Sequence, residues 1–154
     1  MARQSLILAV GLVLASATAP ALAENGSAYT KIDLAACRTF PADPDDPLQS
    51  GAWLCDGYRG VPVYVAEGDL RFFVSYGEGA RDELAARTTL PPFNHIGETI
   101  EWRTAPDGQP VATILRFFTD PGDGGAKGQV LVVTKLGDSG QICHAGYVDA
   151  RANP

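Results

Sequence analysis

The sequence predicts an all-β fold: a single antiparallel barrel or sandwich of about six to seven strands with one short helix. Two observations predict it. Stretches rich in β-branched and aromatic residues recur along the chain, and short clusters of turn residues separate them. Only residues 80–87 are rich in helix formers. Because the connections are short, we expect successive strands to pair as an antiparallel meander.

The first 23 residues are typical of a cleaved signal peptide. Arg3 supplies the positive charge, residues 6–15 form an apolar stretch, and Ala21-Leu22-Ala23 has the small residues of a cleavage site. The apolar stretch is too short for a membrane-spanning helix, which needs about 20 residues. We therefore expect cleavage after Ala23 and one domain over residues 24–154, periplasmic or secreted, with no membrane attachment.

The first half of this domain contains a weak strand, a loop and a hairpin. Residues 28–34 are predicted to form an edge strand. Residues 41–50 form an acidic, proline-rich loop, because prolines and aspartates keep the backbone extended and solvated. A two-residue turn at Glu67-Gly68 then joins strands over residues 61–66 and 69–76 into a hairpin.

The second half contains the helix and the strongest strand patterns. Residues 80–87 are expected to form about two helical turns, because Pro91-Pro92 prevent continuation. We expect a loop over residues 93–97 and, from its alternation of polar and apolar residues, a half-buried strand over 98–103. Three further strands are predicted at residues 110–119, 128–136 and 141–149.

Two strands are apolar on both faces. Phe72-Phe73 and Phe117-Phe118 each place one ring on either side of a sheet, because successive side chains alternate across a strand. A barrel or sandwich covers only one face. The second rings need cover from the helix or the proline-rich loop, or they mark a partner surface, and we expect internal cover.

The chain is acidic, with a formal net charge of −6. Removal of the signal segment, which carries one basic residue and no acidic one, would bring the charge to −7. Nucleic acids and anionic membranes bind concentrated basic faces, so the composition argues against both as partners.

The three cysteines are Cys37, Cys55 and Cys143. An oxidising compartment makes at least one disulfide expected. Cys37 and Cys55 flank the proline-rich loop and are near in sequence, so their pairing closes the ring with the smallest loss of chain entropy. We predict that bridge. Cys143 then remains a thiol inside a strand, where it behaves as a small buried apolar side chain.

No catalytic residue, metal site or cofactor is predicted. The chain lacks the GxSxG, HExxH, CxxC and Walker-type motifs. Cys143 and His144 are neighbours in a predicted strand and point to opposite faces, so they cannot form a catalytic pair. An alternative is a small hydrolase that joins a histidine and a carboxylate in one pocket. Its candidate groups are His95, His144, Asp69, Glu98 and Glu101.

A calcium-dependent envelope module is the second alternative. Hard cations take oxygen ligands from flexible loops, and two loops of this chain are acidic. The aspartates are Asp43, Asp45 and Asp46 in one loop and Asp120 and Asp123 in the other. Their spacing matches no established calcium loop, so we favour solvated turns.

The function predicted first is a non-catalytic binding or inhibitor-type module of the cell envelope, with an exported or cell-wall protein as partner. Aromatic and arginine side chains dominate binding surfaces because they bury much area per ordered side chain. The candidate surface lies near the Cys55 turn and comprises Trp53, Tyr58, Arg59, Tyr64 and Arg71. The alternative is that these residues belong to the core.

Five stretches form one longer pattern. They are WxCxGYxGxPVYVxEGDLRxFVSYG at 53–77, FNxxGxTIEWR at 93–103, ATILRFF at 112–118, GQVLVVTKLG at 128–137 and CHxGYVDAxANP at 143–154. The pattern resembles an uncharacterised family of small exported bacterial proteins. The resemblance implies no activity and no catalytic residue. It also implies that relatives continue into a short helical tail with another cysteine, which would leave Cys143 without its usual partner here.

Overall fold

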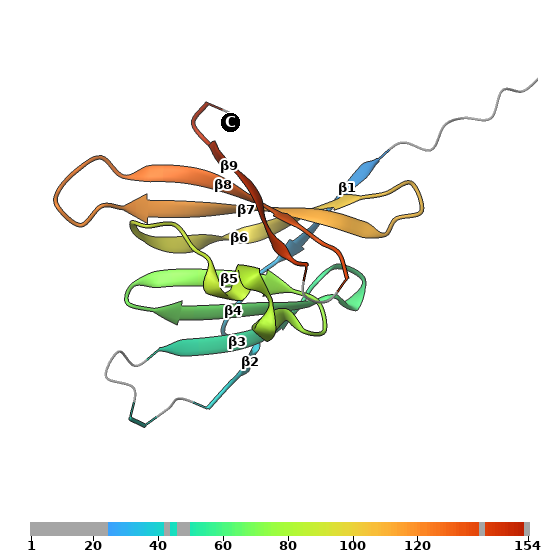
Figure 1. The fold of residues 1–154 in the computed structure, drawn as a ribbon, viewed down its shortest axis with the longest axis horizontal. Helices are drawn as coiled ribbons and strands as arrows, with labels where there is room; N and C mark the ends of the chain where they lie inside the picture. The colour runs from blue at the N-terminus through green and yellow to red at the C-terminus, as the bar shows by residue number, and fades with distance from the viewer. Residues whose placement is uncertain (1–24, 42–43, 46–49, 139–140, 153–154) are drawn as a thin grey trace, which may run out of the picture.

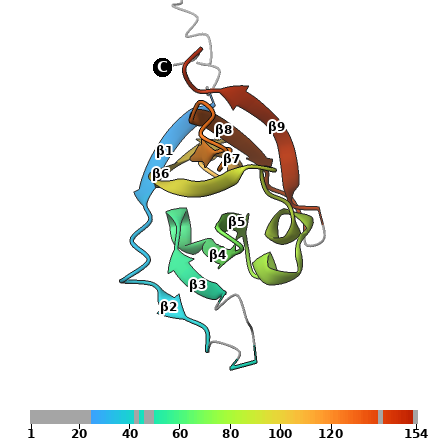
Figure 2. The same cartoon turned by 90° about the vertical axis from the view of Figure 1, so that its left-hand side faces the viewer.

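The computed structural model describes residues 25–41, 44–45, 50–138 and 141–152 (Figure 1). The predicted signal peptide and parts of the predicted loop over 41–50 lie outside the described residues. The described chain is all-β and consists of two antiparallel sheets packed as a sandwich, not closed into a barrel (Figures 1 and 2). The predicted fold class is therefore confirmed.

Sheet A has five strands in the order β1-β6-β7-β8-β9. Their bounds are β1 Gly26–Lys31, β6 Phe93–Thr104, β7 Pro110–Asp120, β8 Gly128–Lys135 and β9 Cys143–Asp149. Sheet B has four strands in the order β2-β3-β4-β5. Their bounds are β2 Arg38–Thr39, β3 Gly51–Asp56, β4 Pro62–Gly68 and β5 Arg71–Tyr76. The described residues thus form nine strands, more than predicted: β2 has only two residues, and β3 was not recognised as a strand beside the proline-rich loop.

The core lies between the sheets. Ile100, Trp102 and Leu115 of sheet A pack towards Val65 and Tyr76 of sheet B, and all five are almost completely buried. The Trp102 ring meets the Tyr76 ring edge to face with centroids 5.5 Å apart. Burial raises the pKa of the Tyr76 hydroxyl, because the charged form would lose its hydration.

The prediction of a helix over residues 80–87 is wrong. Two short 3-10 turns replace it, η2 at Ala80–Asp82 and η3 at Leu84–Arg87. Glu83 separates them with extended backbone, φ −71° and ψ 157°, and its buried carboxylate accepts a hydrogen bond of 3.1 Å from the Ile142 N–H. This tertiary contact overrides the helix propensity of the segment.

Two other local predictions need correction. The segment 93–97, predicted as a loop, begins β6 and pairs with the end of β7. A register shift between Ile96 and Ile100 interrupts the alternation there, which hides the strand in the sequence. The β4–β5 turn lies at Asp69 and Leu70, two residues after the predicted Glu67-Gly68.

The paired phenylalanines point to opposite faces, as expected. Phe117 is buried in the core, whereas Phe118 lies half-buried on the outer face of sheet A. On sheet B, η3 packs against β5, and Ser75 on that outer face is fully buried. Phe73, on the same outer face of sheet B, is half-buried beside η3, so the second rings of both pairs, Phe73 and Phe118, are only partly covered.

A third short turn, η1 at Tyr58–Gly60, follows β3. Gly57 before it lies so close to Trp102 and to the Val61 carbonyl that an added Cβ would be less than 3 Å from both. A glycine is therefore required by close packing against the core. Among the described residues, no helix is long and apolar enough to cross a bilayer.

Candidate functional site

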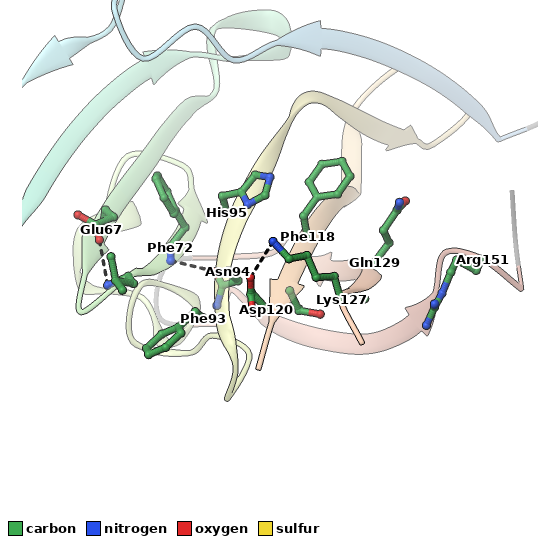
Figure 3. Close-up of a pocket in the computed structure, with 13 residues that line it drawn as sticks. Glu67, Phe72, Phe93, Asn94, His95, Phe118, Asp120, Lys127, Gln129 and Arg151 are labelled. Carbon is green, nitrogen blue, oxygen red and sulfur yellow. Dashed lines mark hydrogen bonds and ion pairs between the residues drawn. The ribbon is translucent and has the colours of Figure 1, made fainter. Parts of the chain in front are cut away.

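A cavity of about 540 Å³ opens at one end of the sandwich (Figure 3). Figure 1 shows the β4–β5 turn and the β7–β8 loop at this same end, and the cavity is lined by residues of both. Most of its wall is apolar or aromatic. The side chains that give it this character are Leu70, Phe72, Phe93, His95 and Phe118.

His95 and Phe118 form a stacked pair on one side of the site. They face each other across β6 and β7, which places their side chains on the same face of sheet A. Their ring centroids are 4.9 Å apart and the ring planes differ by 13° (Figure 3). The pair offers a flat aromatic surface for a ligand.

Asn94 forms hydrogen bonds that connect β5 to the start of β6 and to the segment before it. Its Oδ1 accepts a hydrogen bond of 2.9 Å from the Phe72 N–H, and its Nδ2 donates to the carbonyl oxygens of Leu90 and Pro92 at 3.3 and 3.0 Å. Its backbone N–H donates to the Leu70 carbonyl at 3.0 Å. Asn94 is buried and its amide is fully used, so its role is to fix the position of the cavity wall.

The β4–β5 turn at the cavity mouth has an unusual backbone. Asp69 and Leu70 have φ of 51° and 59°, positive at both central positions as in a type I′ turn. Such turns favour Asn and Gly, and a left-handed conformation costs other residues about 1 kcal/mol or more. The Glu67 carboxylate accepts a hydrogen bond of 3.1 Å from the Leu70 N–H. The Leu70 side chain is 64% exposed.

Arg71 holds the turn from the other side. Its guanidinium forms an ion pair with Asp69 and donates from Nε to the Pro91 carbonyl at 3.0 Å. The same group lies over the Phe93 ring, 5.3 Å from the centroid. Arg71 therefore connects the turn to the segment that leads into β6.

The charged residues that line the cavity are two carboxylates, Glu67 and Asp120, and two cations, Lys127 and Arg151, so their formal charges sum to zero. Asp120 and Lys127 form an ion pair of 2.9 Å, and the Lys127 hydrogen bond, together with that of the Gly122 N–H, lowers the pKa of the Asp120 carboxyl. Arg151 lies 3.6 Å from Asp149. The cavity mouth therefore carries no unbalanced charge from these groups.

Gln129 supplies a polar group to the wall. Its Oε1 accepts a hydrogen bond of 2.7 Å from the Arg116 guanidinium, which leaves its amide nitrogen as a donor. Within the described part of the chain this nitrogen has no hydrogen-bond partner. It can therefore orient a ligand that carries an acceptor.

The five residues of the predicted binding surface do not meet on one face. Trp53 and Tyr58 pack against the core, and the Tyr58 ring lies 6.2 Å from Trp102. Tyr64 lies on the opposite face of sheet B, where its ring meets Phe40. Trp53 and Tyr58 are half-buried and Tyr64 is buried, so all three side chains make packing contacts.

The two arginines of that surface lie at opposite ends of β4. Arg59 belongs to η1, before β4 begins, and donates to the Asp107 carbonyl at 3.4 Å. Arg71 follows β4 and lies beside the cavity. Of the five predicted residues, only Arg71 takes part in the arrangement around this site.

The predicted disulfide between Cys37 and Cys55 is present, with Cα atoms 4.6 Å apart. It joins the segment before β2 to β3. Cys143 is a free thiol and, as the first residue of β9, is half-buried.

The histidines lie in different surroundings. His95 stacks on Phe118, and the His144 Nδ1 lies 2.9 Å from the Tyr147 hydroxyl. Burial lowers the pKa of His144, because the charged ring would lose hydration. Two carboxylates proposed for an enzyme are engaged by arginines, Asp69 by Arg71 and Glu101 by Arg103. The hydrolase alternative remains an untested prediction.

Among the described residues, no group of three or more His, Cys, Asp or Glu side chains is arranged to hold a metal ion. Asp43 and Asp46 of the calcium prediction lie outside the described residues. Asp120 pairs with Lys127, and the Asp123 carboxylate accepts a hydrogen bond of 2.9 Å from the Gly125 N–H. The calcium alternative also stays a prediction.

Comparison of the chain with family models, with curated proteins and with solved structures finds no match. The resemblance to small exported bacterial proteins therefore stays a prediction.

Proposed function

We propose that this protein is an exported, non-catalytic binding module whose cavity takes a compact, uncharged apolar or aromatic small molecule. The observation that carries the proposal is the aromatic-lined cavity. Its volume of about 540 Å³ lies within the range of about 300–1,000 Å³ common for small-molecule sites, and such sites combine apolar walls with few polar groups.

The charges of the wall favour an uncharged ligand. Asp120 and Lys127 satisfy each other, and the Glu67 carboxylate accepts the Leu70 N–H. The formal charges of the lining residues Glu67, Asp120, Lys127 and Arg151 sum to zero, so a charged ligand would lose its hydration without meeting a wall of opposite net charge. An uncharged ligand would bury apolar surface without that penalty.

Two features of the wall would give the ligand its orientation. The stacked rings of His95 and Phe118 favour a flat apolar group, because aromatic rings gain from stacking or edge contact as well as from burial. The Gln129 amide nitrogen would donate to an acceptor on the ligand.

Export is supported by the Cys37–Cys55 disulfide, since such bonds persist in oxidising compartments. The leading apolar segment of the sequence agrees with it. An exported or cell-wall protein partner stays a prediction. The proposed binding site is the cavity, because Trp53, Tyr58, Arg59 and Tyr64 do not lie together on one face.

The test uses the uncharged fluorophore N-phenyl-1-naphthylamine, whose emission rises in apolar surroundings. We expect saturable binding by the wild-type protein. Phe118→Ala removes one ring of the stacked pair and should weaken binding about fivefold, which corresponds to about 1 kcal/mol. Tyr29→Ala, at an exposed ring of β1 outside the cavity, is the matched control and should bind as the wild type does.

Emission that never saturates, or an equal loss of affinity in Phe118→Ala and Tyr29→Ala, would refute the proposal. Circular dichroism of each variant checks that the sheets are retained.

A further inference from the structure

We infer that Leu70 is the anchoring residue of this site: a strained turn holds its side chain at the cavity mouth, where it closes over the apolar body of the bound ligand. The inference rests on the proposed function. It names the residue that makes the contact and requires a ligand that reaches from the cavity to the turn.

The backbone at Leu70 is unfavourable for this residue type. Asp69 and Leu70 both have positive φ, and the Cβ of an L-residue crowds the neighbouring backbone in that region. Glycine avoids the crowding and asparagine tolerates it. A leucine at the second central position therefore opposes the turn in which it lies.

Folding also buries little of the apolar surface of the Leu70 side chain. It is 64% exposed, so most of its apolar surface remains in water in the free protein. One exposed leucine is ordinary by itself. Leu70 is exposed and also has an unfavourable backbone conformation, so it favours neither burial of apolar surface nor formation of the turn. Residues that oppose their local structure in this way are expected at functional sites.

Contacts from other parts of the chain maintain this conformation. The Glu67 carboxylate accepts the Leu70 N–H, and the Leu70 carbonyl accepts the Asn94 N–H at 3.0 Å. Arg71 pairs with Asp69 and is itself held by the Pro91 carbonyl. Strained conformations persist when the surrounding structure determines them in this way.

Asn94 links the turn to the cavity. Its backbone holds Leu70 while its side chain holds Phe72, and all three residues line the cavity. The turn therefore has a fixed position relative to the wall. Preorganisation of this kind lowers the entropy lost on binding, because the contact residue is already in place.

The experiment compares Leu70→Gly and Leu70→Asn with the wild type. Each variant is measured in a thermal melt and in a titration with N-phenyl-1-naphthylamine. Glycine relieves the strained backbone and should raise the melting temperature, while loss of the leucine side chain should weaken binding at least threefold. Leu70→Asn tolerates the turn and should show the same loss of affinity.

Leu84→Ala is the matched control, because Leu84 is 61% exposed and lies in η3, away from the cavity. We expect wild-type affinity for this variant. Wild-type affinity in Leu70→Gly and Leu70→Asn would overturn the inference and leave the proposed function standing. A lower melting temperature for Leu70→Gly would also overturn it, because the turn would not be strained. Absence of saturable binding by the wild-type protein would overturn both.

Discussion

Asn94 shows how one buried polar side chain can organise the wall of a site. It satisfies the Phe72 N–H on β5 and two carbonyl oxygens in the segment before β6. Buried polar groups left without a partner cost about 1–3 kcal/mol, so the network is essential to local structure.

Replacement of Asn94 by alanine should therefore lower the free energy of unfolding by about 2–3 kcal/mol. Urea unfolding monitored by tryptophan fluorescence measures it. Asn25→Ala, at an exposed position before β1, is the control and should change stability by less than about 0.5 kcal/mol. A similar small change for both variants would show that the Asn94 network does not stabilise the fold.

At the scale of elements, strands with a strong local sequence pattern could be predicted, whereas elements that depend on contacts with distant residues could not. The alternating and β-branched residues of β4, β5, β7 and β8 predicted those strands within a few positions. The helix over residues 80–87 failed because the buried Glu83 bonds to Ile142, far away in sequence. The start of β6 was missed because its register shift breaks the alternation.

The β4–β5 turn was misplaced for a related reason. Glycine usually marks the turn of a hairpin, and Gly68 suggested that position. The structure keeps Gly68 in β4 and turns at Asp69 and Leu70 instead. A strained turn that other elements hold in place gives no local signal, so the residue that we propose as the anchor could not be found from sequence.

The Cys37–Cys55 bridge is a covalent cross-link between the segment before β2 and strand β3. β2 has two residues and, among the described strands, pairs only with β3, so the bridge provides much of its attachment. Replacement of both cysteines by alanine should reduce the free energy of unfolding by about 3 kcal/mol, because the unfolded chain regains the entropy of an open loop.

Denaturant unfolding of the double variant measures this loss, and hydrogen exchange should show β2 exchanging faster while β7 keeps its protection. Cys143→Ala is the control, since this thiol forms no disulfide. It should lower the free energy of unfolding by less than about 1 kcal/mol. Equal stability of the double variant and the wild type would mean that the bridge does not stabilise the folded state.

At the scale of the whole molecule, the site depends on the packing of two sheets. The residues that line the cavity are scattered along the sequence between Glu67 and Arg151. They come from both sheets and from the segments between their strands. The sequence predicted Arg71 as part of a binding surface and His95 as a candidate group of the hydrolase alternative. It could not show that Phe72, His95 and Phe118 lie around one hollow, because their proximity exists only after the sheets pack.

The central claim is that this cavity, with Leu70 at its mouth, is the binding site. The most direct measurement is a titration of the ¹⁵N-labelled protein with N-phenyl-1-naphthylamine, followed by amide chemical shifts. The account predicts that the largest shifts cluster at Leu70, Phe72, Asn94, His95 and Phe118. Shifts centred on Trp53, Tyr58 and Tyr64, or no shifts at a saturating concentration of the ligand, would contradict it.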